Sequence, residues 1–188
     1  MGNRSQAVFA IWITGLPASG KSTITRALRE QLAGRGIDVA VLESDAVRKI
    51  LEEQPSYDPE ARARFYRYLA YAGVLLTQHG VPVIFDATAN RRIYRDWARQ
   101  QIPRFIEVFI DCVLETCMAR DPKGIYRKAS EGGAHTVPGL QEPYEPPEAA
   151  DIVVDSKHDP ALAAERILEK LKERGYLANR FPRRVVRQ

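Results

Sequence analysis

The stretch over residues 9–30, FAIWITGLPASGKSTITRALRE, decides the fold of this chain of 188 residues. It begins with β-branched and aromatic residues typical of a buried strand, and Ile24, Leu28 and Leu32 then recur on one helical face. Between them, residues 15–22 match the pattern G-x-x-x-x-G-K-[ST], with a strand before and a helix after. The match predicts a phosphate-binding loop (P-loop), because its glycines let backbone N–H groups turn toward phosphate oxygens.

The P-loop predicts a site for ATP and Mg²⁺. We expect Lys21 to reach the β- and γ-phosphates as a mobile cation and to act catalytically. The hydroxyl of Ser22 is expected to ligate Mg²⁺. The residues of this stretch predicted to bind the nucleotide are Gly15, Ala18, Ser19, Gly20, Lys21, Ser22 and Thr23.

Length, composition and charge limit the classes of protein. The chain is long enough for one hydrophobic core, so we expect a single domain over residues 1–188, with a basic tail over about 175–188. The chain has no apolar run of the roughly 18 residues that span a membrane and no signal peptide, which predicts a cytoplasmic protein without a membrane partner. The net charge of +4 comes without an aromatic stacking motif, so no nucleic-acid partner is expected. Cys112 and Cys117 are expected to be buried, reduced thiols.

Strand patterns alternate with helix patterns along the chain. This alternation predicts an α/β P-loop kinase fold, a mostly parallel five-stranded sheet with helices on both faces. A polar segment over about residues 121–150 lies between the last two strands, and we expect it to form a lid. The predicted strands cover residues 8–14, 38–42, 81–87, 104–111 and 151–156, and the predicted helices cover residues 21–36, 45–53, 58–80, 91–101, 114–121 and 159–175.

Two four-residue stretches resemble GTPase motifs and compete with the interpretation as a kinase. DPKG at residues 121–124 matches D-x-x-G, and SKHD at residues 156–159 nearly matches N-K-x-D. DPKG follows a predicted helix, however, whereas the GTPase motif ends a strand and opens a switch loop. Because such short patterns often arise by chance, the sequence favours a kinase.

A kinase that phosphorylates a small hydroxyl compound needs a carboxylate beside the acceptor, arginines that neutralise charge, and a lid that excludes water. Glu43 and Asp45 follow the second predicted strand, at the edge of the sheet where ligands gather. Asp45 is the candidate catalytic base and is also placed to cap the next helix. Arg48 follows one turn later and is expected on the same side.

Three further stretches give the chain its resemblance to the adenylylsulfate (APS) kinase family. LESDAVR at residues 42–48 corresponds to LDGDNVR in that family, RDPKGIYRKA at residues 120–129 to RDPKGLYKKA, and EPYEPP at residues 142–147 to DPYEPP. The match runs in order from about residue 8 to about residue 172. The resemblance implies ATP, Mg²⁺, phosphoryl transfer to the 3′-hydroxyl of adenosine 5′-phosphosulfate (APS) and a homodimer, and it makes DPKG the opening of the lid.

The resemblance also implies roles for single residues. Asp45 matches the acid that handles the acceptor hydroxyl, and Arg120 matches a lid arginine assigned to the ATP side. Asp86, which ends the third strand, has no counterpart in the family; it resembles the Walker-B carboxylate of sugar and polynucleotide kinases, which supports Mg²⁺, and a polar strand end is an equal alternative. The residues expected to bind substrate are Glu43, Arg48, Arg62, Phe65, Arg91 and His135.

The departures from the family pattern gather on the acceptor side. Phe65 stands where the family has a substrate-contacting Asn, and residues 87–91, ATANR, replace ISPYR. In the lid, His135 and Val137 replace a Lys and a Phe that contact the substrate nucleotide. Three hypotheses stay open: an APS kinase with a divergent pocket; a relative that phosphorylates another hydroxyl compound, such as a different nucleotide diphosphate derivative or a sugar; and a nucleotide-binding module without turnover.

Overall fold

The computed structural model describes residues 8–51, 53 and 55–177. Five strands form one sheet in the order β2-β3-β1-β4-β5, and every neighbouring pair is parallel. The predicted α/β fold with a parallel five-stranded sheet is therefore confirmed. The strands are β1 (Ala10–Thr14), β2 (Ala40–Glu43), β3 (Val83–Asp86), β4 (Phe105–Asp111) and β5 (Ile152–Asp155).

The central strand β1 is buried along its whole length. Ile11 and Ile13 belong to the core on one face of the sheet, and Ala10 and Trp12 belong to the core on the other face. A parallel strand needs this cover on both faces, which explains why its sequence is a nearly continuous apolar run. The P-loop therefore leaves the sheet from its fully buried central strand.

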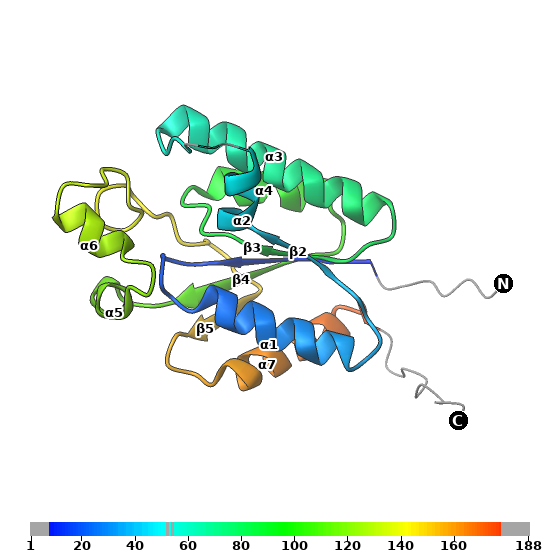
Figure 1. Ribbon diagram of the computed structural model, residues 1–188. Coiled ribbons are helices and arrows are strands. Elements are labelled where there is room, and N and C mark those ends of the chain that lie inside the picture. Colours follow the sequence, from blue (N-terminus) through cyan, green and yellow to red (C-terminus); the bar gives the residue numbers. More distant parts are fainter. Residues whose placement is uncertain (1–7, 52, 54, 178–188) are drawn as a thin grey trace, which may run out of the picture.

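Helices cover both faces of the sheet (Figure 1). The helices α1 (Lys21–Ala33) and α7 (Pro160–Glu173) pack together on one face. The other face carries α2 (Ser44–Leu51), α3 (Pro59–Gln78) and α4 (Arg92–Gln101). The helix α3 lies close to the sheet at Gly73, where a Cβ would be 2.1 Å from Cζ of Phe85, so a larger residue would force the two apart.

Helix α7 begins where the sequence predicts it. The Asp159 carboxylate accepts hydrogen bonds from the backbone N–H groups of Ala161 and Leu162, and Pro160 occupies the first turn. Pro needs no backbone donor there, and its fixed φ suits a helix start. Asp58 and Pro59 start α3 in the same way, with Asp58 accepting from the N–H of Ala61.

The predicted lid contains a helix that its polar sequence did not indicate. After α5 (Leu114–Arg120), the chain turns at Gly124 into α6 (Ile125–Ser130). The Asp121 carboxylate accepts hydrogen bonds from the N–H groups of Ile125, at 2.7 Å, and Arg127, at 2.9 Å. Figure 1 shows α5 and α6 beyond the carboxyl ends of the strands, on the same side as the P-loop.

Three further predictions concern membrane-spanning helices, the two cysteines and the basic tail. In that part of the chain, no helix is both long and apolar enough to cross a membrane. Cys112 and Cys117 are buried and not joined in a disulfide, as predicted. The predicted basic tail lies mostly outside the described residues, which end at residue 177.

Candidate active site

The P-loop joins β1 to α1 in a conformation that small residues allow. Gly15 and Gly20 have φ angles of 151° and 106°, and a Cβ on Gly15 would lie 2.8 Å from the backbone oxygen of Ile110. Ala18 has a φ of 61°, which is uncommon for a residue other than glycine. The Lys21 Nζ donates to two carbonyl oxygens of the loop, at 2.8 and 3.1 Å, so this side chain folds back over the loop.

A buried charged cluster lies at the start of α1. Asp86 ends β3, the neighbour of β1, and is only 4% exposed. Burial raises the pKa of the Asp86 carboxyl, whereas Lys21 and a hydrogen bond with Ser22 lower it. Burial lowers the pKa of the Lys21 ammonium, and the nearby Asp86 and Asp45 carboxylates oppose this change. Lys21 and Asp86 therefore stabilise each other's charged forms inside the protein.

The oxygens of Ser22 and Asp86 are of the kind that Mg²⁺ prefers. Magnesium usually takes one or two ligands from the protein and completes its shell with phosphate oxygens and water. Over the described ranges, no group of three or more His, Cys, Asp and Glu side chains could hold a metal ion. The donor set thus suits an ion that shares its ligands with a nucleotide.

Glu43 and Asp45 meet a lysine of the lid at the same edge of the sheet. The Lys123 Nζ lies 2.6 Å from Oδ2 of Asp45 and 3.6 Å from Oε1 of Glu43. The hydrogen bond to Asp45 raises the pKa of Lys123. Asp45 is the second residue of α2, inside its first turn, and its carboxylate pairs with the lid, which corrects the prediction that it caps the helix.

Two buried arginines line the cleft beside these carboxylates. The guanidinium carbon of Arg48 lies 3.6 Å from the centre of the Phe65 ring and 4.8 Å from that of Tyr57. Arg62 donates to the backbone oxygen of Thr136 at 2.7 Å and to that of Tyr57 at 3.2 Å. Arg48 is therefore held between two aromatic rings, and Arg62 ties α3 to the lid.

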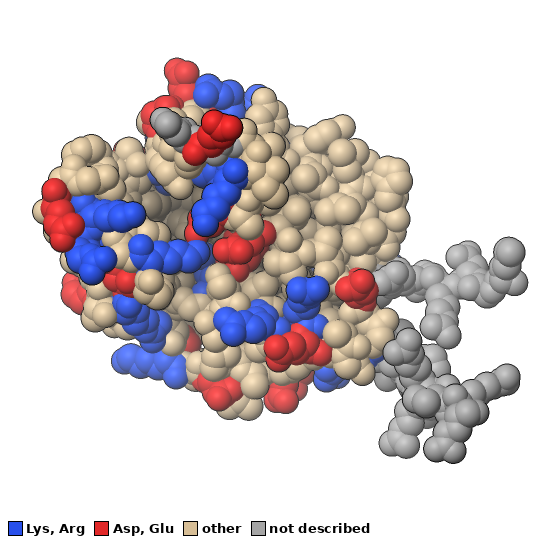
Figure 2. Space-filling model, in the orientation of Figure 1, with Lys and Arg blue, Asp and Glu red and all other residues tan. Residues whose placement is uncertain are grey.

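Most of the predicted site residues surround one cleft of about 820 Å³. Figure 2 shows Lys and Arg side chains gathered around a hollow on this side of the molecule. Arg120 closes the cleft beside the P-loop, with Nη1 3.4 Å from the backbone oxygen of Ser19. The predicted residues that line the cleft are Ala18, Ser19, Gly20, Lys21, Ser22, Thr23, Glu43, Asp45, Arg48, Arg62, Asp86 and Arg120.

Four predicted residues lie outside this lining. Gly15 does not line the cleft, but its backbone oxygen accepts a hydrogen bond from Lys21, which does. Phe65 is 2% exposed and packs beneath Arg48, so the structure gives it an indirect role in place of the predicted substrate contact. Arg91 and His135 are exposed and do not line the cleft, although His135 stands between the lining residues Ala134 and Thr136, and their substrate-binding roles stay predictions.

Sequence reasoning missed several side chains that line the cleft, namely Tyr57, Tyr66, Thr88, Lys123 and Thr136. A signal for three of them was present. Lys123 belongs to the DPKG stretch, Thr88 to the ATANR stretch, and Thr136 lies between the two substituted lid positions. Tyr57 and Tyr66 stand outside every quoted motif, and they reach the cleft from the segment just before α3 and from α3 itself.

The site has the three parts of a P-loop kinase. These parts are a P-loop after the central parallel strand, carboxylates at the carboxyl edge of the sheet, and a lid beside them. The family model of adenylylsulphate kinase matches residues 7–155, and this chain belongs to that family.

The comparisons with single proteins point the same way. Similar proteins include the adenylyl-sulfate kinase of Synechococcus sp. (strain JA-3-3Ab), 37% identical over 94% of this chain and 99% of that protein. The probable adenylyl-sulfate kinase of Pyrococcus abyssi is 38% identical over 90% of this chain and 98% of that protein. The structure resembles that of the Mycobacterium tuberculosis APS kinase CysC in complex with AMPPNP and APS, with a TM-score of 0.82 and 30% identity over 88% of this chain and 98% of that one.

Proposed function

We propose that the protein transfers the γ-phosphoryl group of ATP to the 3′-hydroxyl of APS. One observation carries the proposal: Lys21 of the P-loop and Asp45 line the same cleft. In that cleft the lid residue Lys123 forms ion pairs with the carboxylates of Glu43 and Asp45. The names of the similar proteins and the AMPPNP and APS bound to the similar M. tuberculosis enzyme support this substrate pair.

The nucleotide half of the proposed site uses the P-loop and its neighbours. Backbone N–H groups of the loop would bind the phosphates of ATP, and Lys21 would stabilise the charge that develops on the transferring phosphoryl group. Ser22 would ligate Mg²⁺ with Asp86 supporting it; when bound, this ion neutralises charge on the β- and γ-phosphates. Arg120 would cover the nucleotide from the lid side.

The acceptor half uses the carboxylates and arginines of α2 and α3. Asp45 would orient the acceptor hydroxyl and take its proton as the phosphoryl group transfers. Arg48 and Arg62 supply positive charge for the anionic groups of the acceptor, and their burial makes that charge more effective than it would be in water. Lys123 carries a further positive charge from the lid to the carboxylates, so closing the lid also completes the site.

A second candidate function is phosphorylation of a different hydroxyl compound. Val137 lines the cleft where the family resemblance places a stacking Phe, and Phe65 lies under Arg48 instead of in the cleft. Stacking on a base contributes roughly 1–3 kcal/mol. The loss of that contact favours an acceptor whose recognition depends less on the adenine ring.

An ADP-release assay over APS, cytidine and uridine diphosphate derivatives and sugars separates these functions. We expect APS to have the highest kcat/KM, within the range of about 10⁴–10⁸ M⁻¹s⁻¹ that enzymes show on their own substrates. A clearly better acceptor would favour the second candidate, and no acceptor-dependent release would indicate a nucleotide-binding module. The Lys21→Ala variant serves as the control for contaminating ATPases.

We also infer a homodimer, on the strength of the family resemblance. The outer face of α3 exposes Tyr68, Tyr71 and Leu75 at helical spacing, which gives a second copy an apolar surface to cover. Light scattering of the purified protein should give twice the mass of the chain. A mass equal to one chain at a protein concentration of about 10 μM would contradict a dimer with a Kd of about 1 μM or lower, which corresponds to a binding free energy of about −8 kcal/mol.

A further inference from the structure

We propose that Arg95, which does not line the cleft, is a positioning residue that joins the acceptor side of the site to the end of the lid. The acceptor wall is defined here as residues 87–91, which follow β3, and the lid return as residues 143–146. Thr88 of the acceptor wall lines the cleft. The inference rests on the proposed function, because that function makes residues 87–91 part of the acceptor site.

The acceptor wall has a conformation that needs support from its surroundings. Ala89 has a φ of 41°, which residues with a Cβ rarely adopt. Its backbone N–H donates to the hydroxyl of Tyr66 at 2.9 Å. The backbone oxygen of Thr88 accepts from Oγ1 of Thr14 at 2.6 Å. The position of Thr88 in the cleft therefore depends on hydrogen bonds that its own backbone and that of Ala89 make with Thr14 and Tyr66.

Arg95 holds the acceptor wall and the lid return with one rigid group. Its side chain is 1% exposed, and its three nitrogens donate to three partners. Nη1 donates to the backbone oxygen of Ala89, Nη2 to that of Glu145 at 2.8 Å, and Nε to a carboxylate oxygen of Glu107 at 2.6 Å. Because a guanidinium is planar, these bonds fix the spacing between the two segments.

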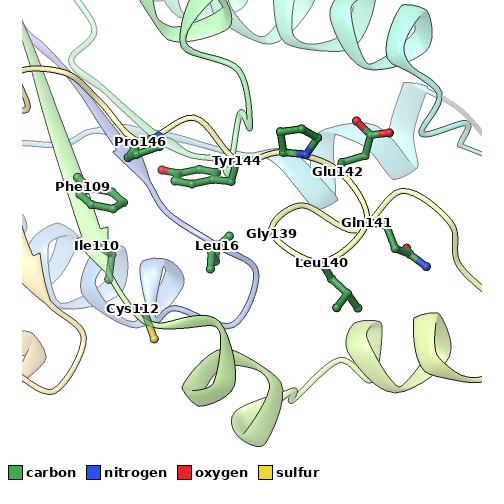
Figure 3. Close-up of a pocket in the computed structure, with 11 residues that line it drawn as sticks. Leu16, Phe109, Ile110, Cys112, Gly139, Leu140, Gln141, Glu142, Tyr144 and Pro146 are labelled. Atoms are coloured by element: carbon green, nitrogen blue, oxygen red, sulfur yellow. The ribbon is translucent and has the colours of Figure 1, made fainter.

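Further bonds join the same two segments. The Asn90 amide donates to the backbone oxygen of Pro143 at 3.0 Å, and the N–H of Glu145 donates to the backbone oxygen of Asn90 at 2.7 Å. Tyr144 of the lid return also stacks on Phe109 of β4, with the ring centres 6.1 Å apart, which ties the lid return to the sheet. Figure 3 shows the two side chains near each other. The acceptor wall and the lid return thus form one unit, with Arg95 at its centre.

The partner of Arg95 offers a matched control. Glu107 is 4% exposed and also accepts from Nη2 of Arg99 at 3.0 Å. Arg99 lies one turn further along α4, and its other hydrogen bonds go to Asp151. A change at Arg99 therefore disturbs the same buried carboxylate without removing a bond to the acceptor wall or the lid return.

The test compares Arg95→Lys with Arg99→Lys. A lysine at position 95 keeps the positive charge beside Glu107 but cannot reproduce the three bonds of the guanidinium. We expect Arg95→Lys to raise KM for APS about tenfold, the size of one lost charge-assisted hydrogen bond, and to leave KM for ATP nearly unchanged. Amide hydrogen exchange should become faster in the acceptor wall and the lid return but not in the P-loop. Arg99→Lys should change neither KM for APS nor the rate of amide hydrogen exchange in the acceptor wall and the lid return.

A second variant, Asn90→Ala, tests the same link without changing the buried ion pair between Arg95 and Glu107. Asn90→Ala removes the bond to Pro143 and leaves Arg95 and Glu107 paired, and it should change KM for APS and the exchange rates in the same direction. Equal effects of Arg95→Lys and Arg99→Lys, or equal changes in KM for APS and ATP, would overturn the proposal. Because hydrogen exchange needs no substrate, a wild-type protein inactive on APS would defeat the proposed function while the exchange rates still decide whether Arg95 positions these segments.

Discussion

The Asp45→Asn variant is expected to lose catalytic activity while it keeps its thermal stability. In the proposed mechanism this side chain takes the proton of the acceptor hydroxyl, and general bases typically contribute about 10²–10⁴-fold to the rate. We expect Asp45→Asn to lower kcat by at least about 100-fold and to leave the affinity for ATP nearly unchanged. The amide keeps the size of the side chain and loses only its charge and its ability to accept a proton.

The structure predicts that the same change has little effect on stability. The ion pair between Asp45 and Lys123 is about half exposed, with 47% and 54% of the two side chains accessible. Solvent screening limits such pairs to about 0.2–1 kcal/mol. For a chain of this length, 1 kcal/mol corresponds to a change in Tm of about 2–4 °C. A larger loss of Tm would point to a structural role for Asp45.

Glu43→Gln is the matched control for Asp45→Asn. Glu43 lies in the same cleft, faces the same lysine at 3.6 Å and is 41% exposed. Steady-state ADP release with saturating ATP and varied APS measures kcat for both variants, and thermal melting measures Tm. The reasoning is refuted if Asp45→Asn keeps more than about a tenth of kcat, or if Glu43→Gln loses as much activity, because a general base is a single residue.

The other predictions concern the P-loop, the metal, the acceptor wall's neighbours and the thiols. Lys21→Ala should abolish ADP release while the protein stays folded by circular dichroism, because Lys21 acts on the transition state; more than about a tenth of the wild-type kcat would contradict this. Burial raises the pKa of Asp86 above its usual 3.8 in the folded protein, so the stabilising contribution of this carboxyl is present at low pH and is lost as pH rises through the raised pKa. The Tm of Asp86→Asn relative to wild type should therefore increase as pH rises above about 4, and a constant difference in Tm would contradict this. Phe65→Asn should raise KM for APS and lower Tm, because it removes the platform of Arg48; improved APS turnover would show instead that Phe65 blocks the acceptor. Burial and the neighbouring Cys112 raise the pKa of Cys117 to about 12, so a thiol reagent at neutral pH should label it only after denaturation, and fast labelling of the native protein would be contrary evidence.

The sequence by itself determined the nucleotide half of the site. The P-loop is eight consecutive residues between a strand and a helix, so its geometry follows from local chain conformation. The Asp159–Pro160 start of α7 is local in the same sense, because the capping carboxylate bonds N–H groups two and three residues away. The alternation of strand and helix patterns then predicted the parallel sheet, since the connections between such strands follow few rules.

Only the tertiary structure decided the acceptor half. Lys123 reaches Asp45 across 78 residues of chain, and Arg95 reaches Glu145 across 50, distances over which no sequence period carries information. Phe65 is another residue whose place the sequence did not reveal. Its place in the sequence matched a substrate-contacting position, but the rotation of α3 on the sheet placed its ring in the core beneath Arg48. Such contacts depend on how helices pack against a common sheet, and that packing is settled by the whole core at once.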